Sequence, residues 1–216
     1  MSQGRSGRPR TFDREAALRT ALELFWARGY EGVSIEDLTS AMGISRPSLY
    51  AAFGDKRTLF HEVVRLYETS EGKVIAELLA APVDTRTAIR NLLLVAAEGY
   101  TRGGPRRALG CLVSTGLLGS ALENEDVANL LRERRRLARE ALADRIKAGI
   151  GRGDVPVGTD CEALASFFAG VLQGIAIQAR DGAPLQGLQS IADLAIKAWP
   201  ETEKRPHELL PARAGR

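Results

Sequence analysis

Residues 34–53 read SIEDLTSAMGISRPSLYAAF and predict two short helices joined by a tight turn. Ser34 stands where a helix N-cap belongs, with its hydroxyl able to accept from the backbone N–H of Asp37. The Asp37 carboxylate can in turn accept a hydrogen bond from the backbone N–H of Ser34, which is the capping-box pattern. Gly43 then supplies the positive φ that a helix C-terminus commonly needs. The first helix is therefore expected to cover residues 35–42.

The second helix of the pair is expected at residues 46–53. Ser45 can cap it, and Pro47 suits its first turn. Helical periodicity turns Leu49 and Phe53 inward and leaves a small, polar outer face. Two helices with such a turn have the geometry of a helix-turn-helix, which places its second helix in a DNA major groove. An ordinary helical hairpin is the alternative that these residues alone leave open.

A third helix completes the unit on its N-terminal side. Asp13 can cap a helix that runs to about residue 28, with Gly29 just beyond its end. Its apolar stripe needs the hydrophobic faces of the two following helices, so we expect a three-helix unit. Trp26 and Tyr30 are expected to brace this unit rather than to contact DNA.

Composition indicates a soluble, helical protein. The chain has 216 residues, 44% of them hydrophobic and 26% charged, which is typical of a globular protein. No run of about eighteen uninterrupted apolar residues is present, and the N-terminus lacks the apolar core of a signal peptide. We therefore expect a cytoplasmic protein without a membrane partner.

Residues that would support catalysis or metal binding are scarce. Cys111 and Cys161 lie far apart, and His61 and His207 are the two histidines. Their spacing predicts no metal site, and no phosphate loop or nucleophile elbow is visible. We expect no cofactor and no enzymatic activity. Both cysteines are interpreted as small buried hydrophobes, with a redox-sensing thiol as the alternative.

The longer run from residue 12 to residue 60 is more specific than a bare helix-turn-helix. It includes LFWARGYEGVSIEDLTSAMGISRPSLYAAFGDKRTLF at residues 24–60 and resembles, without gaps, the DNA-binding head of the tetracycline-repressor (TetR) family. The resemblance implies phosphate contacts from some head residues and positions at or near base edges for others. The phosphate contacts are Ser34, Tyr50 and Lys56, and the base-edge positions are Ser45, Arg46, Pro47 and Ser48.

The first eleven residues form a basic arm without an acidic residue. Gly7, Arg8, Pro9 and Arg10 resemble the glycine-arginine-proline segments that lie in narrow A·T minor grooves. Arg8 and Arg10 are therefore further candidate DNA contacts, and a solvated tail is the alternative.

The remainder of the chain predicts an all-α body, which gives about nine helices in total. A fourth helix, capped by Asp55, runs to about residue 80, and the resemblance implies that it links the head to the body. Further helices are expected at 85–101, 111–122, 125–150, 159–180 and 185–199, with a capping box of Thr159 and Glu162. We expect a flexible arm at 1–11, a DNA-binding domain at 12–57, an effector-binding and dimerisation domain at 58–200 and a flexible tail at 201–216.

Arginines are concentrated in the 125–150 helix and are interleaved with Glu133 and Glu140. A solvated, salt-bridged face is the preferred interpretation, and a nucleic-acid surface is the alternative. These arginines are Arg132, Arg134, Arg135, Arg136 and Arg139.

The last two predicted helices are candidates for a dimer interface. The 159–180 helix is apolar on most sides and could form a four-helix bundle with the final helix and their symmetry mates. The family resemblance implies the same dimer, and an ordinary internal core is the alternative. The candidate interface residues are Phe168, Gly170, Val171, Gly174, Ile175, Ile191, Leu194 and Ala195.

The predicted function is that of a ligand-responsive homodimeric repressor that binds a palindromic double-stranded operator. A small, mostly apolar effector would release it. An activator of the same fold and, less favoured, a helical small-molecule carrier without a DNA role are the alternatives. The candidate residues of the effector pocket are Tyr100, Cys111, Ser114, Thr115, Phe167 and Gln173.

Overall fold

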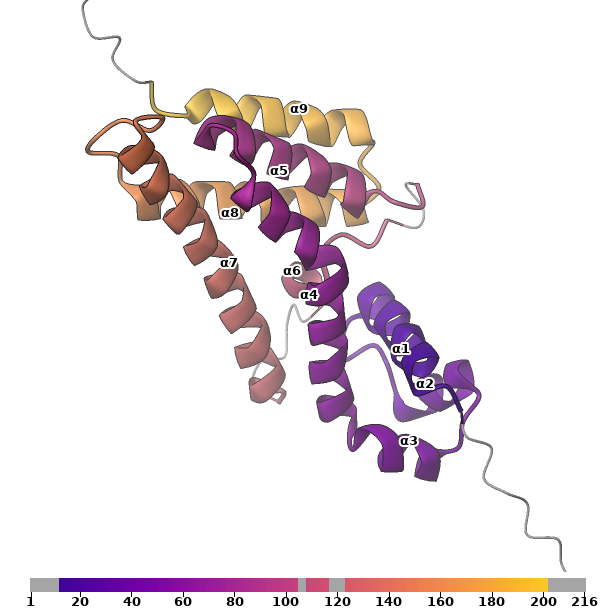
Figure 1. The fold of residues 1–216 in the computed structure, drawn as a ribbon. Coiled ribbons are helices and arrows are strands. Elements are labelled where there is room, and N and C mark those ends of the chain that lie inside the picture. Colours follow the sequence, from indigo (N-terminus) through magenta and orange to yellow (C-terminus); the bar gives the residue numbers. More distant parts are fainter. Residues whose placement is uncertain (1–11, 105–107, 117–122, 202–216) are drawn as a thin grey trace, which may run out of the picture.

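A computed structural model of the protein describes residues 12–104, 108–116 and 123–201, and within these ranges every regular secondary-structure element is a helix (Figure 1). The described residues form nine α-helices followed by a short 3₁₀ helix, which confirms the all-α prediction. Arg8 and Arg10, and the tail from residue 202 onward, lie outside the described residues. The helices are α1 (Arg14–Arg28), α2 (Ile35–Met42), α3 (Arg46–Phe53), α4 (Lys56–Ala80), α5 (Thr85–Tyr100), α6 (Leu112–Thr115), α7 (Glu125–Arg152), α8 (Cys161–Arg180), α9 (Leu185–Ala195) and η1 (Ile196–Ala198).

Side-chain caps begin most of these helices where the sequence places them. Asp13, Ser34, Ser45 and Asp55 each accept a hydrogen bond from a backbone N–H in the first turn of their helix. Each such bond satisfies a donor that the helix itself leaves without a partner. Helix boundaries in the head therefore follow from local chemistry.

Two predicted details of the body are wrong. Helix α8 is capped by Asp160, which accepts from the N–H of Ala163, and not by a capping box of Thr159 and Glu162. The Thr159 hydroxyl instead donates to the carbonyl of Pro156. Helix α6 covers four residues rather than the whole of 111–122, of which residues 117–122 lie outside the described ranges.

Helix α4 joins the two ends of the molecule, with α1, α2 and α3 beside its first half and α5 beyond its second half (Figure 1). Buried head residues such as Phe25, Leu49 and Phe60 share one apolar cluster with Leu112 and Leu131 of the body. A second cluster lies between α5, α7, α8 and α9. The head core therefore continues past residue 57, and the first half of α4 belongs to it.

Helix α8 packs against α5, α7 and α9, yet part of its apolar surface is uncovered. Among the described helices it is the one long and apolar enough to cross a membrane by length and composition, a test that buried core helices also pass. Phe167 and Ile177 of α8 are 43% and 42% exposed, and Leu194 of α9 is 62% exposed. Large apolar side chains rarely gather on a surface without a partner to cover them.

Candidate nucleic-acid interface and ligand cavity

The turn between α2 and α3 fixes the angle between the two helices. Gly43 adopts the left-handed conformation with φ 65°, which a side chain would disfavour. The N–H of Ile44 donates to the carbonyl of Thr39 at 3.1 Å. Leu38 and Leu49 are fully buried and hold the two helices on the same core. The outer face of α3 is therefore presented by a rigid support.

That outer face carries side chains that can form hydrogen bonds with DNA bases. The Arg46 side chain is 62% exposed, and its nearest acidic neighbour, Glu36, lies 3.7 Å away. A guanidinium so placed can donate two bonds to guanine O6 and N7. Tyr50 is 50% exposed, and Ser45 and Pro47 are exposed beside it, whereas Ser48 is partly buried and its hydroxyl lies 2.9 Å from that of Ser45.

Ser34, at the start of α2, is engaged within the protein. Its backbone N–H donates to Asp37 at 2.8 Å, and its hydroxyl lies 2.5 Å from the same carboxylate. Arg28 also donates to Asp37, at 2.8 Å. The bonds from Ser34, followed by the bond from Arg28, hold the pKa of Asp37 well below its usual range.

The stability of the head should consequently depend on the ionisation of Asp37. A depressed folded-state pKa contributes stability above the unfolded-state pKa of about 4, and this contribution is lost as the pH falls further. We expect the difference in free energy of unfolding between wild type and Asp37→Asn to be largest above about pH 4 and to shrink in more acidic solution. Denaturant titrations at several pH values measure this difference, and a difference that does not change with pH would contradict the assignment.

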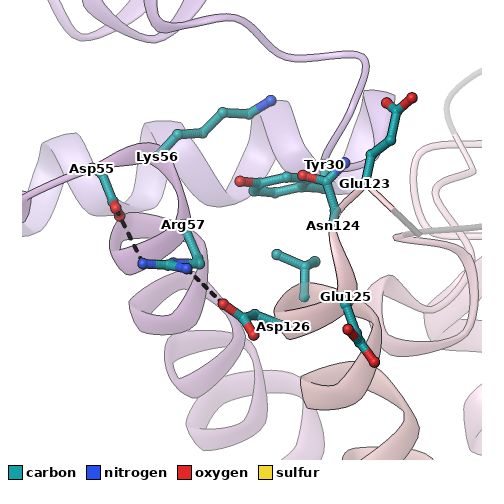
Figure 2. Close-up of a pocket in the computed structure, with 9 residues that line it drawn as sticks. Tyr30, Asp55, Lys56, Arg57, Glu123, Asn124, Glu125 and Asp126 are labelled. Atoms are coloured by element: carbon teal, nitrogen blue, oxygen red, sulfur yellow. Dashed lines mark hydrogen bonds and ion pairs between the residues drawn. The ribbon is translucent and has the colours of Figure 1, made fainter. Parts of the chain in front are cut away.

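Lys56, in the first turn of α4, lies near the start of α7. Its ammonium stands 4.3 Å from the centroid of the Tyr30 ring (Figure 2). Burial lowers the pKa of Lys56, while the carboxylates of Glu31 and Asp37 act in the opposite direction. A phosphate nearby would favour the charged ammonium in the same way. The aromatic ring thus holds a cation at the N-terminal end of α4.

A polar recess of about 490 Å³ separates this end of α4 from the first turn of α7. Figure 2 shows Arg57 between two carboxylates, with Asp126 at 2.6 Å and Asp55 at 3.6 Å. Asn124 donates to Glu31 of the head at 3.0 Å. These contacts connect the head to α7.

The C-terminal end of α1 is also connected to the body. Arg180, the last residue of α8, donates to the carbonyls of Trp26 at 3.0 Å and Ala27 at 2.6 Å. The Trp26 indole donates to the carbonyl of Gly110 at 3.1 Å, and the N–H of Tyr30 donates to Gly116 at 2.8 Å. A cation at the end of a helix satisfies carbonyls that lack helical partners. This connection is not predictable from the sequence, because no local pattern marks a contact between residues 153 or 154 positions apart.

The body contains a mostly apolar cavity of about 340 Å³ between α4, α5, α7 and α8. Four of the predicted pocket residues line it: Tyr100, Cys111, Ser114 and Gln173. Thr115 and Phe167 do not line it: Thr115 is buried and donates to the carbonyl of Cys111, and Phe167 is exposed on α8. The apolar lining, whose residues were not predicted individually, includes Ile75, Leu79, Leu92, Leu137, Leu142 and Leu172.

One wall of this cavity carries two phenols beside a thiol. The Tyr67 hydroxyl donates to the sulfur of Cys111 at 3.4 Å. Burial, followed by the proximity of Cys111, raises the pKa values of both Tyr67 and Tyr100. Both phenols therefore remain protonated and add to the polar groups of a mostly apolar cavity, which Glu68 and Arg134 also line.

Three comparisons with known proteins are consistent with this geometry. A family described as "Bacterial regulatory proteins, tetR family" matches residues 17–63. The chain is 34% identical to the HTH-type transcriptional repressor ComR of Escherichia coli (strain K12) over 199 residues, which cover 92% of this chain and 94% of ComR. It is 31% identical to the HTH-type transcriptional repressor BdcR of the same organism over 192 residues, or 89% of this chain and 91% of BdcR.

Among solved structures, a cysteine mutant of the TetR family transcriptional regulator CifR is similar over nearly the whole chain. It was solved in complex with a 26 bp double-strand operator DNA. The TM-score is 0.84 at 40% sequence identity, and the match covers 89% of this chain and 100% of the CifR chain.

Proposed function

This chain belongs to the TetR family of bacterial transcriptional regulators, and on that premise we propose that it is a homodimeric repressor released from a palindromic operator by a small, mostly apolar effector. The family consists of transcriptional regulators rather than enzymes. The observation that carries the proposal is the exposed face of α3, on which Arg46 and Tyr50 stand beside the start of α4.

DNA binding follows from the arrangement of the head. Arg46 and Ser45 reach base edges in the major groove, while Tyr50 and Lys56 contact the phosphates on either side. Phosphate contacts fix the position of the head on the duplex, and base contacts select the sequence. Arg46 is the one strong base-reading side chain among the candidate base contacts in α3 and its cap, so DNA shape contributes to selection as well. The relatives ComR and BdcR are named as transcriptional repressors, which supports repression over activation.

Dimerisation places two such heads on one operator. The candidate dimer face consists of exposed apolar residues of α8 and α9, Phe167, Ile177 and Leu194, together with the exposed Gly170 of α8. Three residues named from the sequence, Phe168, Ile175 and Ala195, are at most 8% exposed within their own chain. They therefore lie in the core under the proposed interface and do not form its surface. Half-sites about one helical turn apart are what a two-fold dimer of this kind reads.

Effector binding acts through α4. Tyr67, Gly72 and Leu79 of α4 line the cavity, and Lys56 lies at the other end of the same helix. A ligand that favours one position of α4 changes the spacing of the two heads. It releases DNA by the ratio of its affinities for the two states.

Lys56→Ala tests the phosphate contact. Each phosphate contact that is lost should make the slope of log K against log salt shallower by about 0.9, hence by about 1.8 for two heads. Fluorescence anisotropy with operator DNA across a salt series measures the slope. Lys73→Ala is the matched control, because Lys73 lies on the same helix and pairs with Glu77 at 3.6 Å. An unchanged slope in Lys56→Ala would remove this residue from the interface.

A further inference from the structure

A second cavity, of about 330 Å³, lies between α7 and α8 and is strongly basic. Four guanidinium groups of α7 line it, together with polar groups of α8. The arginines are Arg132, Arg135, Arg136 and Arg139, and the polar residues facing them include Ser166 and Gln173. We call this cavity the arginine groove.

The positive charge of the arginine groove is only partly neutralised. Arg136 forms ion pairs with Glu133 and Glu140, as the alternation of charges predicts. Arg132 and Arg135 donate instead to uncharged oxygens, those of Asn129 and of the Val113 carbonyl. In the part of the chain that the structure describes, no ion pair is formed by Arg132, Arg135 or Arg139. The salt bridges expected from the sequence thus form at Arg134, which pairs with Glu68 at 3.2 Å, and at Arg136, but not at these three arginines.

The arginine groove adjoins the apolar cavity of the body. Arg135, Ala169 and Gln173 line both spaces. Arg135 is held at this junction by its 2.7 Å bond to Val113, and burial lowers the pKa of its guanidinium. A partly buried charge without an opposite charge is unfavourable, and an anion beside it removes that cost.

From this juxtaposition we infer that the effector is an amphipathic oxyanion, with its apolar body in the cavity and its carboxylate or phosphate group in the arginine groove. The inference rests on the proposed effector-released repressor and names the chemical class of its ligand. Arg135 and Arg139 bind the head group, because the planar guanidinium matches an oxyanion with two parallel bonds. A ligand of this shape buries apolar surface and neutralises the arginines at the same time.

Isothermal titration calorimetry on the full chain tests this with three probes of equal chain length: decanoate, decyl phosphate and decanol. We expect at least one of the two anions to bind about tenfold or more tightly than decanol, because hydrogen bonds to charged groups are the stronger ones. The anion whose affinity exceeds that of decanol by the larger factor identifies the head group as a carboxylate or a phosphate. The anion preference should fall to about threefold or less in Arg135→Gln while the affinity for decanol is retained.

Two further variants provide a second test of the arginine groove and a control outside it. Arg139→Gln, at an arginine whose side chain forms no hydrogen bond or ion pair with the described residues, should also reduce the preference, even if Arg135→Gln disturbs packing at Val113. Arg86→Gln, at an exposed arginine of α5 that does not line either cavity, should leave the preference unchanged. Thermal unfolding of each variant verifies that it is folded.

Equal binding of decanol and both anions by the wild type would overturn the inference. So would a preference that survives in both Arg135→Gln and Arg139→Gln. Loss of the dimer in these two variants, without any change in anion preference, would assign the arginine groove to the subunit interface and also overturn it. Release of operator DNA by uncharged apolar compounds alone would contradict the inference that the effector is an amphipathic anion, while the proposed function would stand. Failure to bind any operator would contradict the proposed function itself.

Discussion

Phe60→Ala is expected to lower the free energy of unfolding by about 3–5 kcal/mol, the cost typical of removing a buried aromatic ring. Phe60 is fully buried, and its ring meets those of Phe25 and Tyr30 edge to face, with both centroid distances at 5.1 Å. It lies on α4 but fills the core of the head. The substitution should therefore also loosen α1 from α4 and reduce DNA affinity.

Urea unfolding followed by circular dichroism measures this loss. Tyr50→Ala is the matched control, because Tyr50 is an aromatic residue of the same head that is 50% exposed. The control should stay within about 0.5 kcal/mol of the wild type, as surface substitutions usually do. A loss below about 1 kcal/mol for Phe60→Ala would mean that the head and α4 do not share one core.

Phe167→Glu is expected to dissociate the dimer at micromolar concentration and to weaken operator binding by about 100-fold or more. An unpaired carboxylate buried in an apolar interface costs several kcal/mol, and about 2.7 kcal/mol already corresponds to 100-fold. Phe167 is 43% exposed in the single chain, so the substitution leaves the core of each subunit intact.

Analytical ultracentrifugation and operator binding at matched concentrations measure the two effects. Val157→Glu is the control, because Val157 is 91% exposed and lies in the connection between α7 and α8. It should remain dimeric with unchanged affinity. A dimeric Phe167→Glu with wild-type operator affinity would place the interface elsewhere.

Local chemistry made the head largely predictable. Ser34 with Asp37, Gly43 and Ser45 each act within three or four residues of their own position, so the sequence reports them directly. The start of α8 shows the limit of this reasoning. Asp160 caps this helix, whereas the hydroxyl of the predicted cap, Thr159, donates to the carbonyl of Pro156.

The proposed dimer face is harder to predict than the head because α8 is apolar on most sides. Neighbouring phenylalanines take opposite roles: Phe168 is fully buried in the core of its own chain, and Phe167 is exposed. Periodicity identifies a face only when the other face is polar. The hydrogen bonds from Arg180 to the end of α1 could not be predicted for a different reason, because Arg180 and the carbonyls of Trp26 and Ala27 are far apart in sequence.

The most direct test of the central claim is selection of operator DNA by the purified wild-type chain from genomic fragments of its source organism. Anisotropy on the selected fragment then compares it with a scrambled duplex at fixed salt, for the wild type and for Arg46→Ala. We predict a palindromic fragment, bound about a thousandfold or more tightly than the scrambled duplex, and a preference that Arg46→Ala reduces by about tenfold or more. Selection of no common sequence, with equal affinity for both duplexes and no effect of Arg46→Ala, would contradict the account of this chain as an operator-binding repressor.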